Sequence, residues 1–143
     1  MKRFICALAV LISPYTVHAS EKSGAEGYLC VPDYISGFKV SGEGRWLPVN
    51  FNVNDTRHHL RNRDGAWYWT EFGEEPHPSI DKCTSFNDLG FLECKDREDE
   101  VLFNKQSLRY QSVRAYGYVV SDASIDRKHP TTPFYEIGRC SPI

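Results

Sequence analysis

The sequence predicts an all-β protein, a small antiparallel barrel or sandwich of about eight short strands with two disulfides. Short apolar and aromatic segments follow one another along the chain with turn-forming residues between them. Val49-Asn50-Phe51-Asn52-Val53 alternates strictly between apolar and polar residues, as a strand with one buried and one solvated face does. The heptad spacing of long helices is missing from the sequence.

The expected strands are rich in β-branched and aromatic residues. In chain order they are Tyr28–Val31, Gly37–Val40, Leu47–Val53, Ala66–Phe72, Gly90–Lys95, Val101–Phe103, an interrupted Ser107–Val120, and Phe134–Arg139. Turn signals separate them at Ser41-Gly42-Glu43-Gly44, at Asp64-Gly65 and at Asn87-Asp88. Because Asp64-Gly65 directly precedes Ala66-Trp67, it predicts a tight hairpin.

Residues 1–19 contain the three parts of a secretory signal peptide. Lys2 and Arg3 form a positive start, Phe4–Ile12 is apolar, and Val17-His18-Ala19 is a small-x-small cleavage site. The apolar segment is about half as long as a bilayer-spanning helix. We therefore expect residues 20–143 to form a single β-rich domain that is periplasmic or secreted and not inserted in a membrane after cleavage.

The cysteine count supports an oxidising compartment. Of the five cysteines, Cys6 leaves with the signal peptide, and Cys30, Cys83, Cys94 and Cys140 remain. An even number predicts two disulfides, for which three pairings are possible. Cys83 and Cys94 flank a short segment that contains a turn, which favours a local bridge and leaves Cys30 to pair with Cys140. The four residues are spaced poorly for zinc, and we expect no metal and no other cofactor.

Charge and motifs narrow the function classes. The formal net charge of −2 gives no global field that would recruit nucleic acid. The sequence has no Gly-x-Ser-x-Gly motif and no free cysteine once the disulfides form. A hydrolase of envelope polysaccharide or peptidoglycan could still use carboxylates that are distant in sequence, for example Glu71 with Glu136.

We therefore favour a non-enzymatic binding or inhibitor-type module whose partner is an unknown protein or glycan of the cell envelope. Two alternatives stay open, an envelope hydrolase and a structural or envelope-assembly protein.

The candidate binding residues are aromatic and basic. Trp67 and Trp69 share one face of a predicted strand, where they either pack in the core or form an exposed platform that Trp46 could join. The segment 57–63 contains Arg57, Arg61 and Arg63, a basic cluster expected at a solvated hairpin tip or against an acidic partner. Its two histidines are adjacent and should project to opposite sides, which disfavours a shared metal.

The chain resembles a group of small exported proteins of Gram-negative bacteria and their phages. The resemblance rests on the ending Pro133–Ile143 together with Tyr28-Leu29-Cys30, Ser36-Gly37-Phe38 and Gly117-Tyr118-Val119. It implies a periplasmic or secreted location and supplies no catalytic residue.

A looser architectural likeness is to the periplasmic lysozyme inhibitors of the β-barrel type. The likeness rests on Tyr28-Leu29-Cys30 and on Cys140. Val40 stands where those inhibitors have the Tyr of their Ser-Gly-x-x-Tyr loop, so the inhibitory residues are not carried over.

Overall fold

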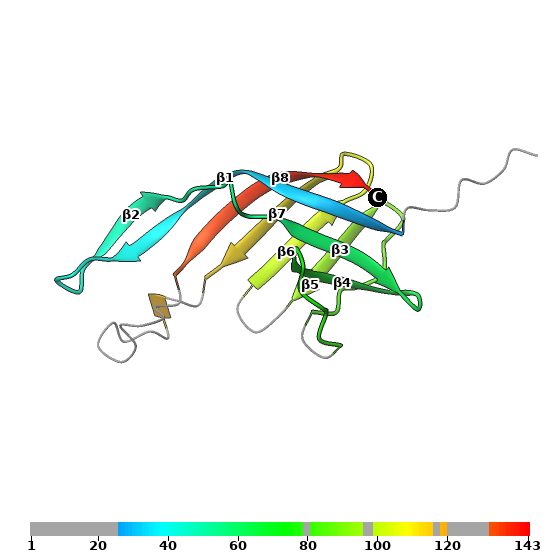
Figure 1. The fold of residues 1–143 in the computed structure, drawn as a ribbon, viewed down its shortest axis with the longest axis horizontal. Helices are drawn as coiled ribbons and strands as arrows, with labels where there is room; N and C mark the ends of the chain where they lie inside the picture. Colours follow the sequence, from blue (N-terminus) through cyan, green and yellow to red (C-terminus); the bar gives the residue numbers. More distant parts are fainter. Residues whose placement is uncertain (1–25, 79–80, 96–98, 116–117, 120–131) are drawn as a thin grey trace, which may run out of the picture.

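The computed structural model describes residues 26–78, 81–95, 99–115, 118–119 and 132–143, and these residues form an all-β protein (Figure 1). The described part contains eight strands, β1 (Gly27–Val40), β2 (Trp46–Asn50), β3 (His58–Arg63), β4 (Ala66–Glu71), β5 (Phe91–Lys95), β6 (Asp99–Asn104), β7 (Arg109–Arg114) and β8 (Phe134–Pro142). The predicted fold class is confirmed. The signal peptide predicted at residues 1–19 lies outside the described residues.

All strand pairs are antiparallel, and seven strands form one curved sheet in the order β4-β3-β1-β8-β7-β6-β5, while β2 lies off this path and pairs with β1. Two predicted strands, Tyr28–Val31 and Gly37–Val40, are joined in the single long strand β1. A register shift between Pro32 and Tyr34 accommodates the proline, which has no N–H to donate to the ladder. The first half of β1 therefore pairs with β3 and the second half with β2.

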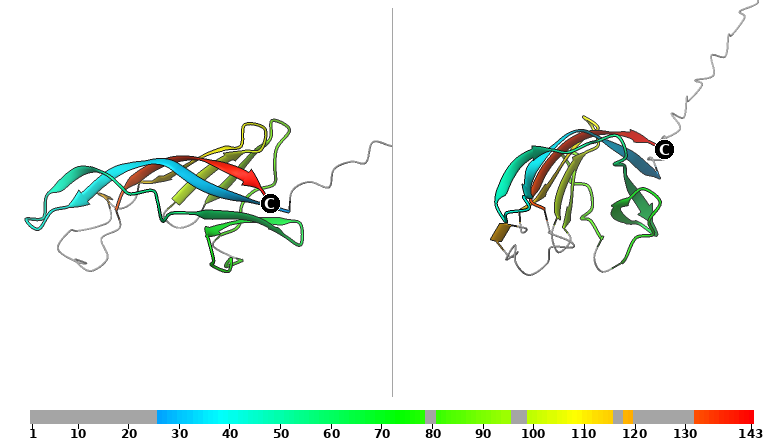
Figure 2. Two further views of the ribbon diagram at one scale, coloured as in Figure 1. Left: turned by 45° about the horizontal axis from the view of Figure 1, so that its top comes forward. Right: turned by 60° about the vertical axis from the view of Figure 1, so that its left-hand side comes forward.

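The segment 81–87 nearly closes the sheet into a barrel by joining the two edge strands (Figure 2). On one side, Trp69 of β4 donates its backbone N–H to the carbonyl of Asp81 at 3.0 Å. On the other side, Thr84 donates its N–H to the carbonyl of Glu93 in β5 at 2.7 Å. A sheet with two covered edges offers few unpaired backbone groups to other chains.

Both predicted disulfides are confirmed. Cys30 of β1 and Cys140 of β8 are direct register partners in the sheet. Cys83 bridges to Cys94 and so attaches the closing segment to β5. By the chain-entropy model, the short loop contributes about 3 kcal/mol and the long loop about 5 kcal/mol. The disulfides indicate an oxidising environment.

The hydrophobic core lies inside the barrel. Leu60, Leu92 and Phe103 are fully buried there, from β3, β5 and β6. The buried position of Leu60 shows that the prediction of a solvated hairpin tip over 57–63 is wrong, because residues 58–63 form strand β3. The turn itself is at Asp64-Gly65, where both residues have positive φ, as a two-residue hairpin of type I′ requires.

The sequence also predicted the seventh strand too long. Within Ser107–Val120 the strand β7 covers only Arg109–Arg114, and residues 116–117 and 120 lie outside the described part of the chain. Among the described residues, no helix has both the length and the apolar character needed to cross a membrane.

The second half of β1 and β2 form a hairpin arm that extends beyond the barrel (Figure 1). Gly37 lies where this arm begins, and a Cβ at this position would be 2.2 Å from the carbonyl oxygen of Pro133. The glycine therefore allows the chain that enters β8 to pass directly over β1, where Phe38 donates its N–H to the same carbonyl.

Candidate functional site

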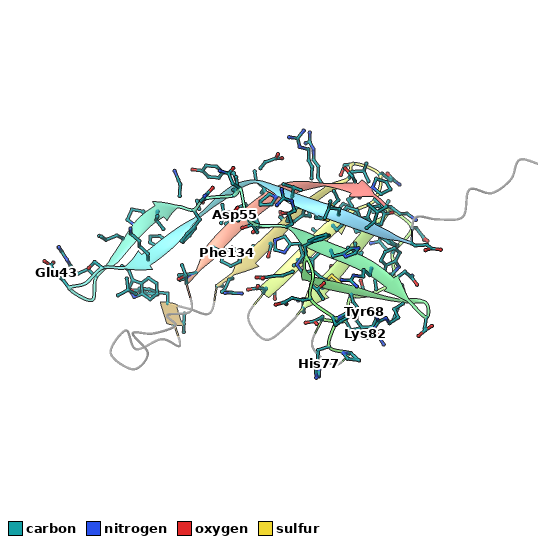
Figure 3. All side chains as sticks on the ribbon, in the orientation of Figure 1. Glu43, Asp55, Tyr68, His77, Lys82 and Phe134 are labelled. Atoms are coloured by element: carbon teal, nitrogen blue, oxygen red, sulfur yellow. A yellow bond between two sulfur atoms is a disulfide. The ribbon has the colours of Figure 1, made fainter. Side chains whose placement is uncertain are left out.

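The concave side of the sheet contains a cavity of about 630 Å³. Its described lining residues come from every strand except β2 and β5, and from the segments before β3, after β4 and before β8. Phe134, at the start of β8, is one of them and is labelled in Figure 3. The volume is within the range of about 300–1,000 Å³ that is typical of small-molecule sites.

A buried carboxylate lies in the wall of this cavity. Glu136 of β8 is only 2% exposed. Its Oε1 atom accepts a hydrogen bond from the hydroxyl of Tyr110 at 2.6 Å and a second from Nε2 of His58 at 2.8 Å. Three strands, β3, β7 and β8, thus contribute one side chain each to a single hydrogen-bonded group, which we call the Glu136 network.

The second oxygen of this carboxylate, Oε2, lies in the part of the chain that the structure describes without accepting a hydrogen bond from any residue of that part. Glu136 lines the cavity, and no described residue donates to its Oε2 atom. Burying an ionised carboxylate costs several kcal/mol unless hydrogen bonds compensate. Here the compensation comes through one oxygen only, and the other remains available to a donor inside the cavity.

Tyr110 is a permanent donor in the network. Burial and the hydrogen bond to Glu136 raise the pKa of Tyr110 far above its usual value, so the hydroxyl keeps its proton. Tyr110 is the register partner of Gly138, which is two residues from Glu136 on β8, and the glycine leaves room for the tyrosine ring. A Cβ on Gly138 would be 2.5 Å from Cε1 of Tyr110.

Two contacts hold the side chain of His58 in place, the hydrogen bond to Glu136 and a stacking contact of its ring. The imidazole stacks on Trp69 with ring centroids 4.8 Å apart and an interplanar angle of 26°. An ionised carboxylate only accepts hydrogen bonds, so with Glu136 ionised the contact requires the proton of His58 to be on Nε2. Its Nδ1 atom is buried and has no hydrogen-bond partner among the described residues.

The opposite part of the cavity wall contains an ion pair. Arg114 of β7 donates two parallel hydrogen bonds to the carboxylate of Asp99 in β6, the longer of them 2.7 Å. The guanidinium also lies over the ring of Phe134, 5.0 Å from its centroid. Arg114 and Asp99 both line the cavity, so the positive charge of Arg114 is neutralised by Asp99 within the cavity wall.

The predicted tryptophans lie on the inside of the barrel and not on an exposed platform. Trp67 and Trp69 share one face, as predicted, and both are partly buried against the core. Trp67 contacts the rings of Tyr28 and Phe86, whereas Trp69 lines the cavity. Trp46 lies apart from them on the arm, with its ring 5.7 Å from that of Tyr118.

The predicted arginines are not among the described lining residues of the cavity. Arg63 pairs with Glu75 at 2.8 Å and, with Arg61, lowers the pKa of that carboxyl. Arg61 also donates to Nδ1 of His59, and Arg57 lies 3.5 Å from the carbonyl of Asn54. The structure therefore does not bring these three arginines together with the tryptophans in one site.

Comparisons with family models, with curated proteins and with solved structures found no match to this chain. Within the described ranges, no cluster of three or more His, Cys, Asp or Glu side chains is arranged to hold a metal ion.

The sequence named Glu136 as one of two paired carboxylates, and the structure has both Glu136 and Glu71 in the lining of one cavity. It did not identify Tyr110 or His58 as partners. The sequence did contain a signal for the burial of Glu136. Glu136 lies four residues before the disulfide cysteine Cys140 on one strand, and residues at this spacing point to the same side of the sheet. In the structure the buried residues of β8 alternate accordingly up to Cys140.

Proposed function

We propose that this protein is an exported binding module and that its ligand occupies the cavity on the concave side of the sheet. The observation that carries the proposal is Oε2 of the buried Glu136, to which no described residue donates a hydrogen bond. A carboxylate held by Tyr110 and His58 in one orientation is a preorganised acceptor, and preorganisation reduces the entropy cost of binding.

The scaffold supports the same proposal. Two disulfides and a nearly closed sheet hold the walls of the cavity in fixed positions. The disulfides fit an extracytoplasmic location, and the signal-peptide pattern in residues 1–19 makes the periplasm or the exterior the compartment we propose. The resemblance to small exported proteins of Gram-negative bacteria and phages agrees with that location.

The test is a ligand screen with the protein and two variants. Glu136→Gln keeps the size of the side chain and an acceptor for Tyr110 and His58, but it replaces the charged oxygen. Glu43→Gln is the matched control, because Glu43 is exposed at the tip of the arm (Figure 3). The screen uses ligand-observed NMR with peptidoglycan fragments, polysaccharide fragments and small polar metabolites.

We expect at least one ligand whose affinity falls about tenfold or more in Glu136→Gln, the change for losing one charge-assisted hydrogen bond. Glu43→Gln should bind like the unmodified protein. Ligands that bind Glu136→Gln and Glu43→Gln equally well would show that the binding site lies outside the cavity. Lysozyme is included, and lysozyme binding that is insensitive to Glu136→Gln would favour an inhibitor that acts through another surface.

The hydrolase alternative has one observation in its favour, since Glu71 and Glu136 line the same cavity. Glycoside hydrolysis uses two carboxyl groups about 5–10 Å apart, one of them a proton donor. The matched test is release of reducing ends from peptidoglycan and polysaccharides by the protein, by Glu71→Gln and by Glu136→Gln. Activity of the unmodified protein that is lost in both variants would support an enzyme. No activity of the unmodified protein would favour the binding module. A structural or envelope-assembly role predicts neither activity nor a cavity ligand.

A further inference from the structure

The charges around the cavity are strongly unequal. Its described lining residues include five carboxylates, those of Glu71, Glu74, Asp81, Asp99 and Glu136, and one arginine. That arginine is already bound by Asp99. The described part of the wall therefore presents an excess of negative charge inside a concave surface, where the low-dielectric protein focuses the field.

The basic groups near the cavity that the structure describes do not balance this excess. Arg63 and Arg61 are both within salt-bridge distance of Glu75, which is not among the described lining residues. Glu71 and Glu74 are exposed, and no described cation pairs with either carboxylate. Together with Oε2 of Glu136, the site has acceptors at its buried wall and at its mouth that no described donor uses.

The walls between these acceptors are aromatic. Trp69, Phe51 and Phe134 line the cavity, and Trp69 lies next to the Glu136 network through its stacking on His58. Aromatic faces attract organic cations through the ring quadrupole and also contact the apolar body that carries the charge. A metal ion has no apolar body and would not make the second kind of contact.

We propose that the cavity binds a small organic cation, an amine on a flat or apolar body, with the ammonium group at Oε2 of Glu136 and the body against Trp69. This inference rests on the proposed binding function and names its class of ligand. The exposed Glu71 and Glu74 at the mouth attract the cation, and the buried Glu136 holds it.

The experiment compares three indoles that differ only in charge. Tryptamine is a cation, tryptophol is neutral and indole-3-acetate is an anion at neutral pH. Titration calorimetry at low ionic strength measures their dissociation constants. We expect tryptamine to bind about tenfold or more tightly than tryptophol, and indole-3-acetate not to bind detectably.

Two sets of variants locate the interaction. Glu136→Gln should reduce the preference for tryptamine over tryptophol to the about twofold to fivefold that Glu71 and Glu74 still supply, while Glu43→Gln should leave the preference unchanged. The double variant Glu71→Gln with Glu74→Gln alters only exposed positions. It should weaken tryptamine by about twofold to fivefold and reduce the dependence of its affinity on salt.

Other outcomes overturn the inference. Equal binding of tryptamine and tryptophol would mean that the cavity does not select charge, although it would still be a binding site. Displacement of tryptamine by equimolar Ca²⁺ or Mg²⁺ would mean a metal site instead. If no indole binds while the wider screen finds a ligand that Glu136→Gln weakens, the cation inference fails and the proposed function stands. If the wider screen also finds none, both fail.

Discussion

At the scale of single residues, the Glu136 network is the least expected part of the molecule. An acidic side chain that is 2% exposed is rare in a domain of this size, and it persists because Tyr110 and His58 both donate to it. Each donor comes from a different strand. Removing one donor would leave the carboxylate with half of its compensation.

Tyr110→Phe tests this arrangement. The variant removes the hydroxyl and nothing else, so we expect the free energy of unfolding to fall by about 1.5–3 kcal/mol, the value of a hydrogen bond to a charged group. Urea unfolding at neutral pH measures it. An unchanged midpoint would mean that solvent replaces the lost donor.

The same residue gives a pH signature. Burial and the bond to Glu136 raise the folded-state pKa of Tyr110, whereas in the unfolded chain it titrates near 10. The stabilisation is therefore fully present below about pH 10 and is lost as the pH rises further, because only the unfolded chain then releases the proton. Tyr110→Phe should lose stability more gradually than the unmodified protein above that pH.

At the scale of elements, strand β3 shows how charge can conceal a strand. Arg57, Arg61 and Arg63 made its segment look solvated, although Leu60 faces the core between charged neighbours. Leu60→Ala should destabilise the protein by about 2–5 kcal/mol, as measured by thermal unfolding. Leu89→Ala is the control, because Leu89 is largely exposed and should change stability by less than about 0.5 kcal/mol.

The elements that the sequence predicted well were specified locally. Asp64-Gly65 predicted its hairpin because only small or flexible residues adopt positive φ readily, and Cys83 with Cys94 predicted a bridge because they are close in the chain. The site was specified differently. Tyr110, Glu136 and His58 meet only through the pairing order of β7, β8, β1 and β3, which is a property of the whole sheet.

At the scale of the whole molecule, one irregular segment completes the barrel. Residues 81–87 take the place of a strand between β4 and β5, and Cys83–Cys94 holds them there. Replacing both cysteines by serine should cost about 3 kcal/mol of stability. It should also increase amide hydrogen exchange at Trp69 and Thr84, which bond across the two edges. Unchanged exchange at these amides would show that the segment stays in place without the disulfide.

The pairing of Cys30 with Cys140 makes the chain between them a covalent ring. Tyr28 and Pro142 lie opposite each other outside this ring, so the described chain enters and leaves the barrel at one point. A ring can be opened elsewhere and still hold its parts together. Linking the two ends directly and cutting the exposed turn at 41–45 would give a permuted chain with the same sheet order. The order of the strands along the polypeptide is therefore separable from their order in space.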